Sequence, residues 1–163
     1  IVVGELRSRD SFETALAAAE TGHLVLTTLH TNNAAQSVSR ILDFYPHEER
    51  EAVRSNLAGN LRAIICQRLV PKSDGTGVVP INEILINTPI ASKLIQAGEL
   101  KKLEAVIAGS ENEGMQSFNA AIIGLIRSGL ISEAVGYRNA SNAEALKMNL
   151  TGIYLNEDTR MIN

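Results

Sequence analysis

The sequence predicts an α/β fold in which a parallel sheet is followed by a bundle of helices. Two short apolar runs with β-branched residues, 1–3 and 24–29, lie close to glycines and read as strands. The alanine-rich stretch 11–21 between them has the apolar spacing of a helix. Strand, helix and strand at this spacing form a βαβ unit, with parallel strands and a right-handed crossover. From Thr88 onward the pattern is helical.

Two helices are expected after the βαβ unit. The first covers 34–44, with Asn32 or Asn33 as its cap. The second starts at Pro46 and runs to about Gln67. Its apolar positions recur at helical spacing and form one stripe: Val53, Leu57, Leu61, Ile64 and Ile65.

A β-hairpin is expected next. The turn sequence SDGTG at 73–77 separates the apolar runs 67–70 and 78–86. Pro80 indicates that the second strand lies at an edge or carries an irregularity.

The remaining helices are separated by glycines or polar caps. They are expected at 89–97, 100–108, 117–127, 132–137 and 141–150. Ser141 and Glu144 have the spacing of a capping box. The last dozen residues mix glycine with polar residues, and we expect them to fray.

Composition excludes several classes of protein. An apolar content of 45% argues against disorder, and a net charge of −3 gives no bulk attraction for nucleic acid. No run approaches the roughly 18 apolar residues of a membrane span, and no secretory leader is visible. Cys66 is the single cysteine, so an internal disulfide and a four-cysteine zinc site are excluded. We expect Cys66 to be a small buried hydrophobe in a reducing, cytoplasmic protein.

Glu5 is the first candidate for chemistry. The apolar strand 1–3 leads directly into Gly4 and Glu5, and Mg²⁺ prefers hard oxygen ligands of this kind. The phosphate-binding sequence GxxxxGK[ST] does not occur in these 163 residues. The alternative for this short motif is a solvated glutamate at a turn.

Two histidines flank the second strand. In a parallel sheet His30 would stand beside Glu5, at the strand ends where such folds bind ligands. His23 lies at the start of the strand and could line a helix surface or an adjoining subunit. Thr28 and Thr31 belong to a run of hydroxyl and amide side chains around His30, which suggests a sensor of the γ-phosphate.

Arg7 and Arg9 follow Glu5 closely. They could bind phosphate, pair with Asp10 or Glu13, or bridge to a neighbouring subunit. For Arg9 a solvated helix start is an equal alternative.

The stretches GELRSRD, AAAETGHLVLTTLHTNNA and GMQSF together resemble the secretion ATPases of the type II/type IV pilus superfamily, within it the twitching-motility retraction branch. The resemblance implies the C-terminal part of a RecA-like P-loop NTPase core with an incomplete sheet (1–87), followed by a helical subdomain (88–163). It also implies a homo-hexameric ring that uses ATP and Mg²⁺.

The resemblance also implies roles for individual residues. Glu5 matches the Walker B acid, which handles Mg²⁺ and the attacking water, and Arg7 matches the arginine that follows it. His23 and His30 match the two positions of the His box. The helix PIASKLIQAGE occupies the place of a helix needed for motility, usually AIRNLIR, and retains Lys93, Leu94 and Ile95.

The chain departs from the family pattern at three points. Ser8 stands where the family has an aspartate, the motility helix lacks its arginines, and the P-loop and upstream Asp box are missing. Assembly and secretion relatives carry a four-cysteine zinc insertion, so the single cysteine favours the retraction branch and no zinc.

Two functions follow as expectations. The first is a hexameric ATPase that couples ATP hydrolysis to type IV pilus retraction, cytoplasmic and peripheral at the inner membrane, where it acts on a platform protein. The stretch shown would then be inactive alone and would expose a sheet edge and an apolar face. The alternative is an interaction or scaffold module without a P-loop, or an ATPase of a related type II secretion or pilus assembly system.

Overall fold

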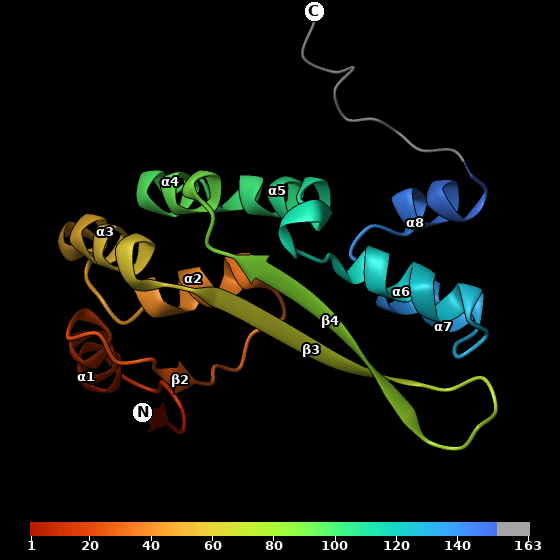
Figure 1. The fold of residues 1–163 in the computed structure, drawn as a ribbon, viewed down its shortest axis with the longest axis horizontal. Coiled ribbons are helices and arrows are strands. Elements are labelled where there is room, and N and C mark those ends of the chain that lie inside the picture. Colours follow the sequence, from red (N-terminus) through yellow and green to blue (C-terminus); the bar gives the residue numbers. More distant parts are fainter. Residues whose placement is uncertain (153–163) are drawn as a thin grey trace, which may run out of the picture. The chain divides into compact units, whose positions relative to one another are not determined.

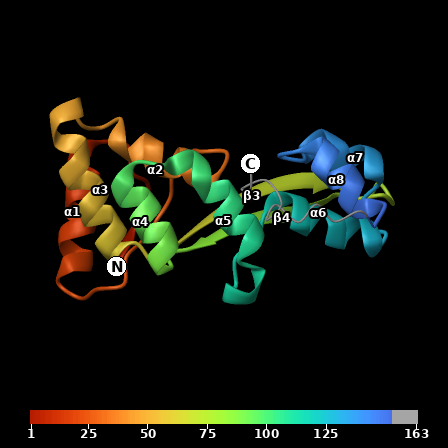
Figure 2. The same ribbon diagram turned by 90° about the horizontal axis from the view of Figure 1, so that it is seen from above.

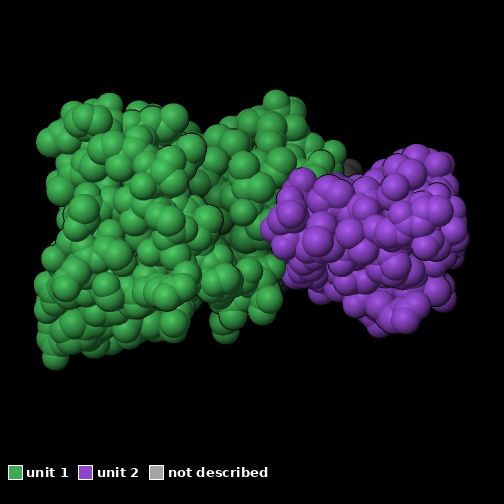
Figure 3. Space-filling view, turned by 90° about the horizontal axis from the view of Figure 1, so that it is seen from below, with its two compact units in different colours: residues 1–66, 83–116 green, residues 67–82, 117–163 purple. Residues whose placement is uncertain are grey.

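The computed structural model describes residues 1–152 and shows two compact units (Figures 1 and 3). Unit 1 comprises residues 1–66 and 83–116. Unit 2 comprises residues 67–82 and the described part of 117–163. The expected fraying of the last dozen residues falls, apart from Gly152, outside the described residues.

The predicted βαβ unit is confirmed at the start of unit 1. Strands β1 (Val2–Val3) and β2 (Leu26–Thr27) pair in parallel, with Val2 opposite Leu26 and Val3 opposite Thr27. Helix α1 (Arg9–Glu20) crosses between them. Backbone bonds extend the pairing, since the Leu6 N–H donates to the Thr28 carbonyl at 3.0 Å. Four large apolar side chains in and next to these two strands are exposed: Ile1, Val2, Leu24 and Leu26.

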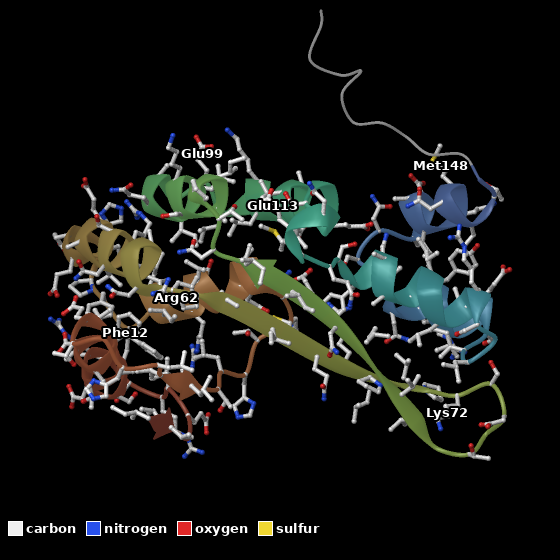
Figure 4. All side chains as sticks on the ribbon, in the orientation of Figure 1. Phe12, Arg62, Lys72, Glu99, Glu113 and Met148 are labelled. Atoms are coloured by element: carbon white, nitrogen blue, oxygen red, sulfur yellow. The ribbon has the colours of Figure 1, made fainter. Side chains whose placement is uncertain are left out.

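Ser8 begins α1 as its N-cap. Its side chain accepts a hydrogen bond from the Ser11 N–H, and the Ser11 hydroxyl completes a reciprocal capping box. The ring of Phe12 points from α1 into the core of unit 1 (Figure 4) and meets Tyr45 edge-on at 6.0 Å between centroids. Because aspartate and serine cap helices about equally well, Ser8 keeps the local structure that an aspartate would give.

Helix α2 (Ala34–Leu42) is capped by Asn33, one of the two predicted residues, whose side chain accepts from the Gln36 N–H. A short 3-10 turn, η1 (His47–Glu49), leads into α3 (Arg50–Asn60). Figures 1 and 2 show α3 between α1 and α4. Val53 and Leu57 of α3 are buried in the core of unit 1.

The helix predicted to reach Gln67 is wrong beyond Asn60. Leu61 is extended, with ψ at 139°, and strand β3 (Ala63–Pro71) begins two residues later. Burial then alternates: Cys66 and Val70 are buried, whereas Ile65 and Leu69 are exposed. This period of two is that of a strand, and two of the five stripe residues, Ile64 and Ile65, therefore belong to β3.

The predicted hairpin is confirmed. Strand β4 (Val78–Ile86) pairs with β3, and the Lys72 N–H donates to the Gly77 carbonyl at 3.0 Å across the turn. Asp74 accepts from the Thr76 N–H at 2.8 Å, which closes the loop locally. Pro80 lies in β4. Among the described residues, the edge of β4 that faces away from β3 carries one isolated β-bridge, from Ile84 to Gln116.

The C-terminal helices occur close to their predicted ranges. They are α4 (Pro89–Ala97), η2 (Leu100–Lys102), α5 (Leu103–Gly109), η3 (Glu111–Glu113), α6 (Phe118–Arg127), α7 (Glu133–Asn139) and α8 (Ala143–Leu150). The capping box predicted at Ser141 is wrong, because Asn142 caps α8 and accepts from the Ala145 N–H at 3.0 Å.

The two compact units differ from the two segments expected from the sequence, 1–87 and 88–163. Residues 88–116 belong to unit 1, because α4 packs on α3 and buries Ala91 and Ile95 in the same core. The assignment of 88–163 as a separate domain of the whole protein stays a prediction.

Unit 2 has a core of its own. The aromatic ring of Phe118 lies under the Arg68 guanidinium, whose Cζ is 3.9 Å from the ring centroid. Arg68 also donates to the Asn139 carbonyl at 2.9 Å. The buried apolar residues of this unit are Val70, Ile81, Phe118, Ile122, Ile131 and Leu146.

We predict that Gly136→Ala destabilises unit 2. A Cβ at this buried position in α7 would lie 2.6 Å from Ile126 Cδ1 and 2.9 Å from Ile122 Cγ2. This overpacking should lower the free energy of unfolding by about 1–3 kcal/mol, measured by urea denaturation. Gly124→Ala in α6 is the matched control, because its Cβ would meet nothing within 4 Å. It should leave stability unchanged or raise it by up to about 1 kcal/mol. Equal effects of the two substitutions would contradict the packing described for Gly136.

Candidate functional site

Glu5 and His30 lie together at the carboxyl ends of β1 and β2. Glu5 follows β1 by two residues and His30 follows β2 by three. Since the strands are parallel, both side chains emerge at the same edge of the sheet. His30 Nε2 is 3.2 Å from Glu5 Oε1, and the Glu5 side chain is 22% exposed against 88% for His30. The pairing is the one expected from the sequence, on an open rim.

Arg7 binds the other oxygen of the same carboxylate. Its Nε donates to Glu5 Oε2 at 2.7 Å, and its Nη2 lies 2.6 Å from the same atom. The hydrogen bond from Arg7 is the main cause that lowers the pKa of Glu5, with smaller contributions from the charges of Arg7 and His30. The same bond raises the pKa of Arg7. The hydrogen bond and the charges both favour the ionised form of Glu5, and its role as a Walker B acid stays a prediction.

The hydroxyl groups of Thr28 and Thr31 are both bonded within the chain. Thr28 Oγ1 donates to the Gly4 carbonyl at 2.6 Å, beside Glu5. Thr31 Oγ1 lies 2.7 Å from the Ser37 hydroxyl in α2. The two threonines thus hold the segment that carries His30, and phosphate binding by either stays a prediction.

His23 lies at the other end of β2, before the strand. Its Nδ1 is 3.2 Å from the Thr21 hydroxyl, next to the end of α1. The ring is exposed. The two histidines thus have separate surroundings, and the role of His23 stays a prediction.

Arg9 belongs to a cluster apart from Glu5. Its Nε lies 2.7 Å from Glu13 Oε1, and its Nη2 lies 2.7 Å from Glu49 Oε2. The guanidinium also covers the Tyr45 ring at 4.8 Å, and burial raises the pKa of Tyr45. Of the roles open for Arg9, pairing with Glu13 is seen. The spacing of Arg9 and Glu13 on one helix was a signal for that pair, whereas no local pattern pointed to Glu49 or Tyr45.

The three residues of α4 predicted to serve motility have different surroundings, and their role stays a prediction. Lys93 is exposed, Leu94 is half-buried, and Ile95 is fully buried in the core of unit 1. Lys93 and part of Leu94 are therefore accessible from outside, whereas Ile95 packs α4 against the core of unit 1.

The described residues offer few metal ligands. No three of their His, Cys, Asp and Glu side chains gather at one point. Mg²⁺ is usually held by one or two carboxylates together with substrate phosphates and water, so the ionised Glu5 fits as one such group. An open depression of about 620 Å³ lies between the start of α2 and the η2–α5 segment, and neither Glu5 nor His30 lines it. No helix in residues 1–152 is long and apolar enough to span a membrane.

Two curated proteins are similar to most of the chain. The type IV pilus ATPase PilU of Pseudomonas aeruginosa is 42% identical over 148 residues, which are 91% of this chain and 39% of that protein. A twitching motility protein of Neisseria gonorrhoeae is 42% identical over 146 residues, 90% of this chain and 39% of that protein. The chain thus spans about two fifths of the length of these relatives.

Solved structures show the same fold. The crystal structure of the pilus retraction motor PilT with bound ADP matches with a TM-score of 0.79 and 37% identity, over 90% of this chain and 41% of that chain. The ATPase DotB of Legionella pneumophila matches with a TM-score of 0.70 and 28% identity, over 93% of this chain and 38% of that chain. A family model described as type II/IV secretion system protein matches residues 1–116. The chain belongs to this family of type II/IV secretion system proteins.

Proposed function

We propose that the chain is part of a longer ATPase that couples ATP hydrolysis to type IV pilus retraction in twitching motility. The observation that carries the proposal is the contact between Glu5 and His30 at the carboxyl ends of two parallel strands. The likeness to PilU and to the ADP-bound retraction motor PilT supports both the ATPase and the pilus.

The chain's own residues suit water activation beside a nucleotide. The Glu5 carboxylate, kept ionised by Arg7, can accept a proton or a hydrogen bond from water. Mg²⁺ with ATP would neutralise phosphate charge at this rim, with Glu5 holding one of its waters. The exposed His30 ring can exchange Glu5 for a phosphate oxygen and so respond to the nucleotide. No zinc is needed for this chemistry.

The assembly that we propose is a homo-hexameric ring in the cytoplasm, peripheral to the inner membrane, which acts on a pilus platform protein there. Exposed Lys93 on α4 is the residue of the motility helix best placed for such a contact. Nucleic acid has no part in this function.

Two alternatives remain distinct. The protein could be a scaffold or interaction module, because phosphate charge needs backbone amides and a lysine around it, and GxxxxGK[ST] is not in this sequence. It could also be an ATPase of a related type II secretion or pilus assembly system. Determining the sequence encoded before Ile1 separates the first alternative from the ATPase, since the ATPase requires a GxxxxGK[ST] loop there. The stretch 1–163 alone should show no ATP hydrolysis.

We predict that Glu5→Gln in the full-length protein lowers the kcat for ATP hydrolysis by about 100- to 10,000-fold, because an amide cannot accept the proton of the attacking water. Nucleotide affinity, measured by isothermal titration, should stay within a few-fold of wild type. Glu20→Gln is the control, since Glu20 is an exposed glutamate at the last residue of α1. Turnover of Glu5→Gln at a rate near that of wild type would refute the assignment.

We predict that Arg7→Met shifts the acid limb of the pH–kcat profile to higher pH. Arg7 lowers the pKa of Glu5, so its removal returns that pKa toward its ordinary value. Glu5 then becomes protonated, and turnover is lost, at a higher pH than in wild type. Arg9→Met removes an equal charge from the same segment but leaves Glu5 untouched, because Arg9 pairs with Glu13 and Glu49. A higher KM for ATP in Arg7→Met without any shift of this limb would show instead that Arg7 serves as a phosphate ligand.

A further inference from the structure

Glu83 is a buried carboxylate that neither the sequence motifs nor the proposed chemistry uses. It lies on the inner face of β4 and is 4% exposed. Its Oε1 accepts a hydrogen bond of 2.8 Å from the backbone N–H of Ala34, a residue 49 positions away. Ala34 is fully buried and is the first residue of α2. The bond therefore joins the hairpin to the start of this helix.

The start of α2 directly follows the segment that carries His30. Within residues 31–34 the chain is bound to α2 at each step. The Asn32 N–H donates to Gln36 Oε1 at 2.7 Å, the Asn33 side chain caps the helix, and Thr31 contacts Ser37. Displacement of the first turn of α2 would thus displace residues 31–33 with it.

The segment before His30 is bonded to residues that follow β1. Thr28 donates through its hydroxyl to the Gly4 carbonyl and accepts through its own carbonyl from the Leu6 N–H. His30 therefore lies between two anchors: Thr28 on the strand that carries Glu5, and Ala34 on the carboxylate of Glu83. One residue separates His30 from Thr28 on one side, and three residues separate it from Ala34 on the other.

The chemistry of Glu83 fits an anchor better than a simple core residue. Burial of a carboxylate costs free energy unless the group is hydrogen-bonded, and an apolar side chain would fill the same place at less cost. The first N–H groups of a helix have no acceptor within the helix. Glu83 Oε1 supplies an acceptor to one of them, the N–H of Ala34 in α2.

We propose that Glu83 is a positioning residue that fixes the segment carrying His30 against Glu5 through the amino end of α2. The part of this inference that concerns turnover rests on the proposed ATPase function, whereas the part that concerns the segment 28–36 does not.

The test uses the full-length protein and three substitutions of Glu83. Glu83→Met removes the acceptor, Glu83→Asp keeps the charge but is one methylene too short to reach Ala34, and Glu83→Gln keeps an acceptor oxygen at the same reach. Hydrogen exchange measured by mass spectrometry reports the amides of residues 28–36, and steady-state kinetics reports kcat and KM for ATP. Leu85→Ala, a fully buried position on the same strand, controls for general destabilisation.

We expect Glu83→Met and Glu83→Asp to raise exchange in residues 28–36 by about tenfold over the rest of unit 1 and to lower kcat by about ten- to hundredfold with little change in KM. Glu83→Gln should restore both toward wild type. Leu85→Ala should lower the melting temperature without a selective rise of exchange in 28–36. If Glu83→Met does not fold, the comparison of Asp with Gln decides alone.

Each contrary result is decisive. Unchanged exchange in residues 28–36 of Glu83→Asp overturns the anchor, whatever the activity. Raised exchange with wild-type kcat overturns the positioning role and leaves a structural bond. Activity retained by Asp but lost by Gln shows that charge, not reach, matters, and also overturns the proposal. Failure of the ATPase function would appear separately, as the absence of ATP turnover in the wild-type full-length protein, and the exchange of residues 28–36 would still test the anchor.

Discussion

The parallel pairing of β1 with β2 is the constraint on which the candidate site depends. The register places Val2 opposite Leu26 and Val3 opposite Thr27, so the residues that follow each strand emerge at one edge. An antiparallel pair would separate Glu5 from His30 by the length of the strand, and a slip of one residue would turn one side chain to the other face. The crossover through α1 enforces the parallel direction, and Ser8 fixes where that crossover begins.

The charge of Glu5 at this edge is balanced by side chains that are largely exposed. Glu5 is the least exposed of its group, whereas its partners Arg7 and His30 are 80% and 88% exposed. Both partners can therefore turn away from the carboxylate without opening the core. Glu5 itself follows the paired strand β1. A less exposed acid with exposed partners would suit the nucleotide-dependent role proposed above.

Local patterns predicted most of the fold, and contacts between distant segments account for the rest. The cap at Asn33 and the bounds of α4 follow from short-range hydrogen bonding, and Glu5 and His30 follow from strand ends. The predicted helix was extended wrongly into β3 because the apolar residues at 61, 64 and 65 also fit helical spacing. The end of α3 is set by a tertiary contact, in which the Asn87 side chain donates to the carbonyls of Ala58 and Leu61. Asn87 lies too far along the sequence to be included in a local pattern around Asn60. Arg9 with Glu49, and Glu83 with Ala34, were missed for the same reason.

The departures from the family pattern can be judged by what each position does in the structure. Ser8 caps α1 through its side-chain oxygen, as an aspartate would in the same geometry. Serine in place of the family's aspartate therefore leaves the N-cap of α1, three residues after Glu5, unchanged. In α4 the buried Ile95 packs into the core, and the exposed Lys93 provides a positive charge on the outer surface. Arginine and lysine differ in their hydrogen-bonding geometry, because the guanidinium binds a carboxylate with two parallel bonds. In the proposed motility role, Lys93 would therefore offer a partner a positive charge without the paired hydrogen bonds of an arginine.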